Sequence, residues 1–198
     1  MIEKRRTAKK DYIAKKAIDV FSALGYKESS LKDIATKGKF SKAGIYHYFK
    51  SKSELLSYIL LSNTDSFFNR LEKSLDSALK ERLNPQKTFE KLIRTYADEL
   101  LSNIKVSLLI LRERHQLTGA KKKILTEKER AIFRLIRDRL KHVPERNTKI
   151  NINLASFQIM SMIHWMGYWF DERGTISKKE AINQTIHLAF HGILKIKK

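Results

Sequence analysis

Three serines in the first third of the chain stand where short helices are expected to begin. Ser30 and Ser51 are each followed, three residues later, by an acidic residue. A serine hydroxyl at a helix start and an acid at this spacing can satisfy each other's free backbone amides. Ser41 follows the break at residues 38–40 and precedes a third helical stretch. Two short helices joined by a tight turn are typical of a helix-turn-helix.

The segment after Ser41 carries side chains suited to DNA. In a helix-turn-helix, the first residues of the second helix reach base edges in the major groove. Lys42 can donate to guanine, and the Ala43 methyl group can contact thymine. Gly44 costs about 1 kcal/mol relative to alanine within a helix, which indicates either close approach to DNA or avoidance of a clash. The predicted DNA contacts are Ser30, Lys32, Lys39, Ser41, Lys42, Ala43, Gly44, Tyr46, His47, Tyr48 and Lys52.

The charge balance favours a polyanionic partner. The 198 residues include 41 Lys and Arg against 21 Asp and Glu, a net charge of +20, and residues 1–54 hold 14 of the basic and 6 of the acidic ones. A basic N-terminal region suits DNA, although it is also what a well-solvated surface would show. There is no cysteine, and no apolar run approaches the length of a membrane span. We therefore expect a cytoplasmic protein without a membrane partner, cofactor or metal.

Apolar spacing of three and four residues predicts an all-α fold of about nine helices. Gly25 is expected to end the first helix, and Asn84-Pro85 to begin the fifth. Gly119 is expected to end the sixth. The expected domains are a helix-turn-helix domain at 1–52 and a ligand-binding and dimerisation domain at 53–198. The expected helices cover about 7–24, 31–37, 42–49, 52–79, 85–103, 106–117, 121–142, 152–170 and 177–196.

The stretch 13–56 resembles the TetR family of bacterial one-component regulators. The residues that carry the resemblance are Ala17, Phe21, Gly25, Tyr26, Ser30, Leu31, Asp33, Ile34, Ala35, Ser41, Lys42, Ile45, Tyr46, Phe49, Lys52 and Leu55. The resemblance implies a phosphate contact for Tyr46. One position departs from the family, which usually has Ala-Gly-Val before the recognition-helix serine, because Lys39 replaces the glycine. A left-handed backbone there would cost lysine up to about 1–2 kcal/mol.

The C-terminal part resembles a TetR subgroup that includes acyl-CoA-responsive repressors. Trp165, Trp169, Phe170, Gly174 and Gly192 carry this second resemblance. It implies a small hydrophobic ligand, with a fatty acyl-CoA as the first candidate. The basic segment 112–149 could meet the phosphates of such a ligand or could be a solvated helix face. The predicted ligand contacts are Tyr96, Arg112, His115, Gln116, Gln158, Met162, His164, Trp165 and Trp169.

The same resemblance implies a homodimer built by the two C-terminal helices. His187 and His191 have a spacing that can chelate a metal, but without an acidic or cysteine partner a place at the interface or surface is favoured. The predicted interface residues are Ala155, Ile159, Ile163, Met166, Ile182, Ile186, Ala189, Phe190 and Ile193.

These patterns predict a dimeric regulator, a repressor that a hydrophobic ligand releases from a palindromic operator in double-stranded DNA. Two alternatives stay open: a repressor of an efflux gene that responds to aromatic or cationic drugs, and a basic DNA-binding protein without a ligand. The large aromatic-rich C-terminal part disfavours the second of these. An enzyme is not expected, because the sequence has no glycine-rich phosphate loop, no Ser-His-Asp spacing and no cluster of metal ligands.

Overall fold

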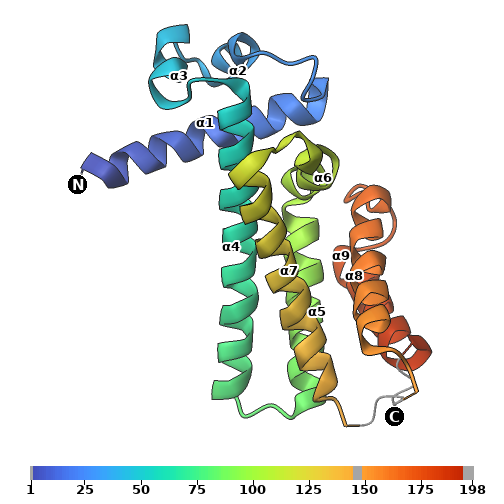
Figure 1. The fold of residues 1–198 in the computed structure, drawn as a ribbon. Coiled ribbons are helices and arrows are strands. Elements are labelled where there is room, and N and C mark those ends of the chain that lie inside the picture. The colour runs from blue at the N-terminus through green and yellow to red at the C-terminus, as the bar shows by residue number, and fades with distance from the viewer. Residues whose placement is uncertain (1, 145–148, 194–198) are drawn as a thin grey trace. The chain divides into compact units, whose positions relative to one another are not determined.

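The computed structural model describes residues 2–144 and 149–193, which are helical and contain no strand (Figure 1). This confirms the prediction of an all-α fold. None of the helices within these two ranges is long and apolar enough to cross a membrane. The α-helices are α1 Ile2–Leu24, α2 Leu31–Gly38, α3 Lys42–Tyr48, α4 Lys52–Lys80, α5 Pro85–Ser102, α6 Ile104–Glu113, α7 Gly119–Lys141, α8 Ile152–Trp169 and α9 Lys178–His187. A 3-10 turn, η1, follows α6 at Arg114–Gln116, and a π-helical turn, η2, follows α9 at Leu188–Ile193.

Side-chain caps begin the helices that were expected to be capped. The Ser41 hydroxyl accepts the amide of Gly44 at 3.0 Å at the start of α3. The Asn84 side chain accepts the amide of Lys87 at 2.8 Å, and Pro85 takes the first helical position of α5. At the end of α1, Gly25 has a φ of +84°, a left-handed backbone that glycine adopts without strain.

Two compact units share the long helix α4. Unit 1 comprises the chain up to Thr64 together with Lys105–Thr126, and its core includes buried side chains from α1, α2, α3, α4, α6 and α7. Ile13 on α1, Ile34 on α2 and Ile45 on α3 are fully buried there, so one apolar core holds α2 and α3 in place. The boundary that was expected after residue 52 falls at the start of α4, which continues without a break to Lys80.

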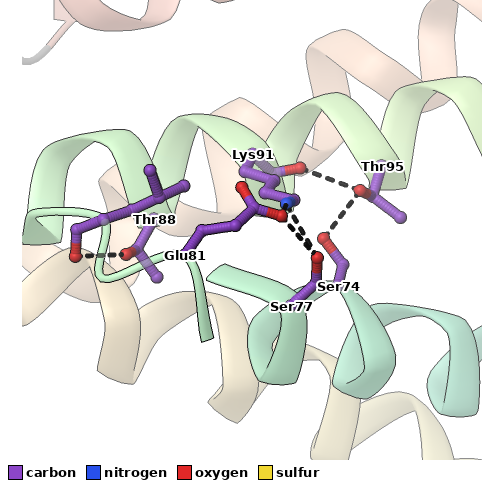
Figure 2. Close-up of polar contacts among 7 residues, drawn as sticks. Ser74, Ser77, Glu81, Thr88, Lys91 and Thr95 are labelled. Carbon is purple, nitrogen blue, oxygen red and sulfur yellow. Dashed lines mark hydrogen bonds and ion pairs between the residues drawn. The ribbon is translucent and has the colours of Figure 1, made fainter. Parts of the chain in front are cut away.

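Unit 2 comprises Asp65–Ile104 and the chain from Glu127 onward. Its core joins α4, α5, α7, α8 and α9 through buried apolar side chains such as Phe89, Ile136 and Ile159. A polar seam runs along its edge between α4 and α5 (Figure 2). There, Lys91 Nζ donates to Glu81 Oε1 at 2.5 Å.

The same seam in Figure 2 includes Ser74 and Thr95, whose hydroxyls lie 2.8 Å apart. The Thr88 hydroxyl donates to the Leu83 carbonyl at 3.3 Å, just before α5. These contacts join the C-terminal part of α4 and the turn that follows it to α5.

Three helix ends differ from expectation. The first helix, expected from about residue 7, begins at Ile2. The prediction that Gly119 ends the sixth helix is wrong, because α6 ends at Glu113 and Gly119, with a φ of +55°, is the first residue of α7. Glycine fits a left-handed backbone at either end of a helix, so its presence did not identify which end. The last helix, expected to reach residue 196, changes to π-helical hydrogen bonding at Leu188, and residues 194–196 lie outside the described part of the chain.

Candidate DNA-binding site

The turn between α2 and α3 has the left-handed backbone anticipated at Lys39. Its φ and ψ are 53° and 44°, its amide donates to the Thr36 carbonyl at 3.3 Å, and the Phe40 amide donates to the Ala35 carbonyl at 2.9 Å. In this pair of hydrogen bonds, the two residues that follow the helix donate to carbonyls of its last turn, which ends the helix and satisfies those carbonyls. The turn therefore forms with lysine in place of glycine, and the Lys39 side chain is exposed beside α3.

The glycine that the turn does require is Gly38, and the reason is packing. A methyl group on Gly38 would lie 2.1 Å from Cε2 of Phe40, whose ring covers this position. The Phe40 ring in turn meets Tyr12 of α1 edge to face, at 5.5 Å between centroids. Lys9 Nζ lies 5.2 Å from the Phe40 centroid. The turn therefore packs against α1 through an aromatic contact with Tyr12 and a cation–π contact with Lys9. The sequence did not indicate these contacts.

Helix α3 has one buried and one exposed side. Ile45 is fully buried, and Tyr48 packs partly against the core of unit 1. Ala43, Tyr46 and His47 are exposed on the other side, with Tyr46 at 46% of its surface. The side chain of Lys42 lies outside the described residues. Of the predicted DNA contacts on α3, Ala43, Tyr46 and His47 thus lie on the exposed side, whereas Tyr48 packs partly against the core.

Gly44 also has a local explanation. A methyl group there would lie 3.0 Å from the Ser41 hydroxyl oxygen, the atom that caps α3. That distance is tight but can be relieved by a small movement of the serine side chain. Avoidance of a clash, one of the two interpretations of this glycine, therefore has structural support.

The start of α2 is held by a reciprocal cap. Asp33 Oδ2 accepts the Ser30 amide at 2.8 Å and the Ser30 hydroxyl at 2.6 Å, while the Asp33 amide donates to the Ser30 hydroxyl oxygen at 3.2 Å. These hydrogen bonds lower the pKa of the Asp33 carboxyl group below its usual value. Because the Ser30 hydroxyl donates its proton to Asp33, it is not available to donate to a phosphate. Lys32, exposed in the first turn of α2, is the cationic side chain at this helix start.

Lys52, predicted to clamp the DNA backbone, has a different set of partners. Its ammonium group donates to the carbonyls of Tyr26 at 2.6 Å, Ser29 at 2.6 Å and Lys27 at 3.0 Å. It also lies 4.6 Å from the centroid of the Tyr26 ring. An ammonium group has three N–H donors, and here all three are used. Lys52 therefore anchors the loop between α1 and α2, and a phosphate contact would have to displace one of these carbonyls.

The N-terminal half of α1 is fixed by further contacts. The Tyr58 hydroxyl donates to Asp11 Oδ1 at 2.6 Å, and Lys10 Nζ lies 5.5 Å from the Tyr58 centroid and 5.4 Å from that of Phe49. Burial and the neighbouring Asp11 carboxylate raise the pKa of Tyr58 to about 12. These contacts from Lys10 and Asp11 join the basic helix α1 to Tyr58 of α4.

Comparison with known proteins assigns the fold to a family. A family model of the bacterial regulatory proteins of the tetR family matches residues 13–59, and a model of the tetracyclin repressor-like C-terminal domain matches residues 82–193. The chain belongs to the TetR family. This is a family of DNA-binding transcriptional regulators, and the matched N-terminal segment contains the whole of α2 and α3.

Individual relatives of this TetR-family chain are distant. It is 30% identical over 71 residues to the transcriptional repressor KstR2 of Mycolicibacterium smegmatis, a match that covers 36% of this chain and 35% of that protein. It is 27% identical over 110 residues to the repressor DhaR of Mycobacterium sp. (strain GP1), covering 52% of this chain and 54% of DhaR. The chain thus spans about a third to a half of the length of these relatives.

Solved structures share the fold over nearly the whole chain. The TetR-family regulator PfmR from Thermus thermophilus superposes with a TM-score of 0.80 at 24% identity, covering 91% of this chain and 97% of PfmR. AibR, solved in complex with isovaleryl coenzyme A and operator DNA, gives a TM-score of 0.80 at 19% identity, covering 96% of this chain and all of AibR. At these identities the likeness establishes the fold alone.

The residues predicted to bind a ligand are divided between the two units of this TetR-family structure. Arg112, His115 and Gln116 belong to unit 1, whereas the rest of the set belongs to unit 2. Within unit 2, Gln158 is exposed, Met162 is half-buried, and Trp165 and Trp169 are 61% and 73% exposed on α8.

Two members of the set do meet in the core of unit 2. The Tyr96 hydroxyl lies 2.6 Å from His164 Nε2, and the Tyr96 ring packs edge to face against Phe67. Burial lowers the pKa of His164 and raises that of Tyr96, so both groups are neutral near pH 7. This tyrosine–histidine pair places a polar contact within a largely apolar core, whose other buried polar side chains include Ser156 and Thr185.

The residues predicted to form a dimer interface face the inside of the protomer. Their spacing places them on one side of each helix, as predicted. However, α8 has a second apolar side, and spacing alone does not tell which of the two sides is buried. Ile193 has a side chain outside the described residues. The buried members are Ala155, Ile159, Ile163, Ile182, Ile186, Ala189 and Phe190, with Met166 partly buried against them.

The two histidines considered as a chelating pair lie close together. The rings of His187 and His191 have centroids 4.5 Å apart, and both residues are exposed. Among the residues that the structure describes, no group of three or more potential metal ligands occurs.

The anchoring role of Lys52 leads to a stability prediction. Lys52→Met keeps much of the aliphatic chain but removes the ammonium donor from three carbonyls, of which only that of Tyr26 keeps a second donor, the Ser29 hydroxyl. We therefore expect the free energy of unfolding to fall by about 1–3 kcal/mol. Urea denaturation followed by circular dichroism measures the change. Lys50→Met is the matched control, since Lys50 is an exposed lysine two residues away. Equal, small losses in both variants would show that the loop does not depend on Lys52.

Proposed function

We propose that this chain is a dimeric transcriptional repressor that binds DNA through α3 and is released by a hydrophobic ligand. The observation that carries the proposal is the two-sided character of α3. Ile45 fixes its inner side in the core, while Ala43, Tyr46 and His47 stay exposed on a helix capped by Ser41. An inserted helix with small and hydrogen-bonding side chains in its first turns suits the major groove.

The proposed roles divide into positioning and sequence reading. Tyr46 offers a hydroxyl to a phosphate oxygen, as the family resemblance implies, and Lys32 and Lys39 supply exposed cations near the same surface. Contacts to phosphates position a protein on the duplex, and contacts to base edges specify the sequence. Lys42 and Ala43, in the first turn of α3, are the proposed base-reading residues.

The proposed dimer interface is the outer side of α8. Leu154, Phe157, Trp165 and Tyr168 expose 46–62% of their surfaces, and the Trp165 and Tyr168 rings lie 5.5 Å apart. A row of large exposed apolar side chains is typical of an interaction surface. Since TetR-family interfaces involve the C-terminal helices, we assign this row, in place of the buried set, to contact with a second copy. Two helices from each copy would form a four-helix bundle.

The proposed ligand site is the core of unit 2 around Tyr96 and His164. A largely apolar site with one or two polar groups is the usual form of a small-molecule pocket. The C-terminal resemblance and the isovaleryl coenzyme A in the AibR structure make an acyl-CoA the first candidate for this chain. A response to aromatic or cationic drugs remains the second candidate, because the Phe67 and Tyr96 rings of this core suit such compounds equally well.

DNA binding by α3 predicts distinct effects for two substitutions. Tyr46→Phe should weaken binding to a preferred duplex and to a scrambled one by similar factors, because it removes a phosphate contact. Lys42→Ala should reduce the preference between them by about tenfold, since a good base contact contributes about 1–3 kcal/mol of discrimination. Fluorescence anisotropy across a salt series measures both.

Tyr12→Phe is the control for the tyrosine variant, because Tyr12 is as exposed as Tyr46, is not among the predicted DNA contacts, and keeps its ring contact with Phe40 when only the hydroxyl is removed. If Lys42→Ala weakened binding to the two duplexes equally, Lys42 would be a backbone contact and the assigned role would be wrong.

Ligand release is tested with acyl-CoAs of increasing chain length added to the protein–DNA complex. We expect longer chains to lower DNA affinity by 5- to 150-fold, the range of a coupling of about 1–3 kcal/mol, and free CoA to have little effect. Tyr96→Phe should alter the response to acyl-CoA while leaving DNA affinity without ligand unchanged. Release by an aromatic cation and by no acyl-CoA would favour the drug-responsive alternative.

A further inference from the structure

A hollow of about 430 Å³ lies in unit 1 where α6, η1 and α7 meet. Its size is within the range of small-ligand sites. The floor is apolar, with Leu125 buried and Leu111 half-buried. The rim carries exposed charged or polar side chains. The lining residues are Leu111, Arg114, His115, Lys122, Leu125 and Thr126.

The charged groups on this lining are all of one sign. Arg114 and Lys122 are cationic, and no acidic residue lines the hollow. Residues 105–126 include six lysines and arginines but only one acidic residue, Glu113. Glu113 lies 3.4 Å from the side-chain amide of Gln116. The hollow therefore presents positive charge above an apolar floor.

The walls are part of the same core that supports α2 and α3. Leu109, Leu117 and Leu125 are buried in the core of unit 1 together with residues of α1 and α4. Lys105, one residue into α6, pairs with Asp19 of α1 at 2.8 Å. A ligand in the hollow would thus contact helices that share one apolar core with α2 and α3.

We propose that this hollow binds an anionic amphiphile, namely an organic phosphate that carries a hydrocarbon chain. The planar guanidinium group of Arg114 can donate two hydrogen bonds to a phosphate, and Lys122 supplies a second cation. The chain would lie against Leu111 and Leu125. This site is separate from the Tyr96–His164 pair of unit 2, and it does not depend on the function proposed for that pair.

Neighbouring lysines offer a matched control. Lys121 and Lys123 flank Lys122 on the first turns of α7 and are equally exposed, but neither lines the hollow. A diffuse attraction to positive charge would depend on all three lysines alike, whereas a formed site depends on Lys122 alone among them.

The test is isothermal titration calorimetry of the full chain with decyl phosphate below its micelle concentration. Decanol and inorganic phosphate serve as probes of each half of the ligand. We expect saturable binding of decyl phosphate, with at least tenfold weaker binding of the other two. Lys122→Ala and Arg114→Ala should each weaken decyl phosphate binding about tenfold, and Lys121→Ala and Lys123→Ala should not. Circular dichroism confirms that each variant is folded.

Three results would overturn the proposal: no saturable binding of decyl phosphate, an equal loss in the Lys121→Ala and Lys122→Ala variants, or an effect of Lys122→Ala on duplex DNA affinity without one on decyl phosphate. The last would identify the hollow as a DNA-contacting surface. DNA affinity is measured without the probe, so a failure of the proposed DNA-binding function would be visible separately from a failure of this site.

Discussion

The DNA-binding unit depends on the contact between the Lys52 ammonium group and three carbonyls of the loop between α1 and α2. The carbonyls of Tyr26, Lys27 and Ser29 point toward one side chain at the start of α4. Without this donor the Ser29 carbonyl would be left partly buried and unsatisfied, which is costly for a backbone group, while the Tyr26 carbonyl would keep only the Ser29 hydroxyl as a donor. The contact fixes the loop, and the loop leads directly into the Ser30 cap that begins α2.

From this loop onward, each step constrains the next. The reciprocal cap of Ser30 and Asp33 begins α2, and the left-handed Lys39 ends it. The Phe40 ring covers Gly38 and contacts Tyr12 of α1, so the direction in which α3 leaves the turn is set by packing. The inner side of α3 is then committed to the core, and its other side remains free for DNA.

The sequence was most informative where structure is local. Caps at Ser30, Ser41 and Asn84 are pairwise contacts over three residues, so they were predictable from spacing. A left-handed backbone at Lys39 was considered only because the family usually has glycine there. Tertiary contacts were not predictable in this way. Lys52 looked like a phosphate ligand because its partners lie 23 to 26 residues away, and the Phe40–Tyr12 contact has no local signal. On α8, two apolar sides made the buried one indistinguishable from the exposed one.

The central claim is that two copies of the chain present α3 to successive major grooves. Selection of bound duplexes from a random library, followed by footprinting and mass measurement of the complex, tests it most directly. The account predicts an enriched inverted repeat, protection centred on half-sites about 10 base pairs or a multiple of that apart, and an even number of chains per duplex. A single chain bound with full affinity, or no enriched sequence at all, would contradict it.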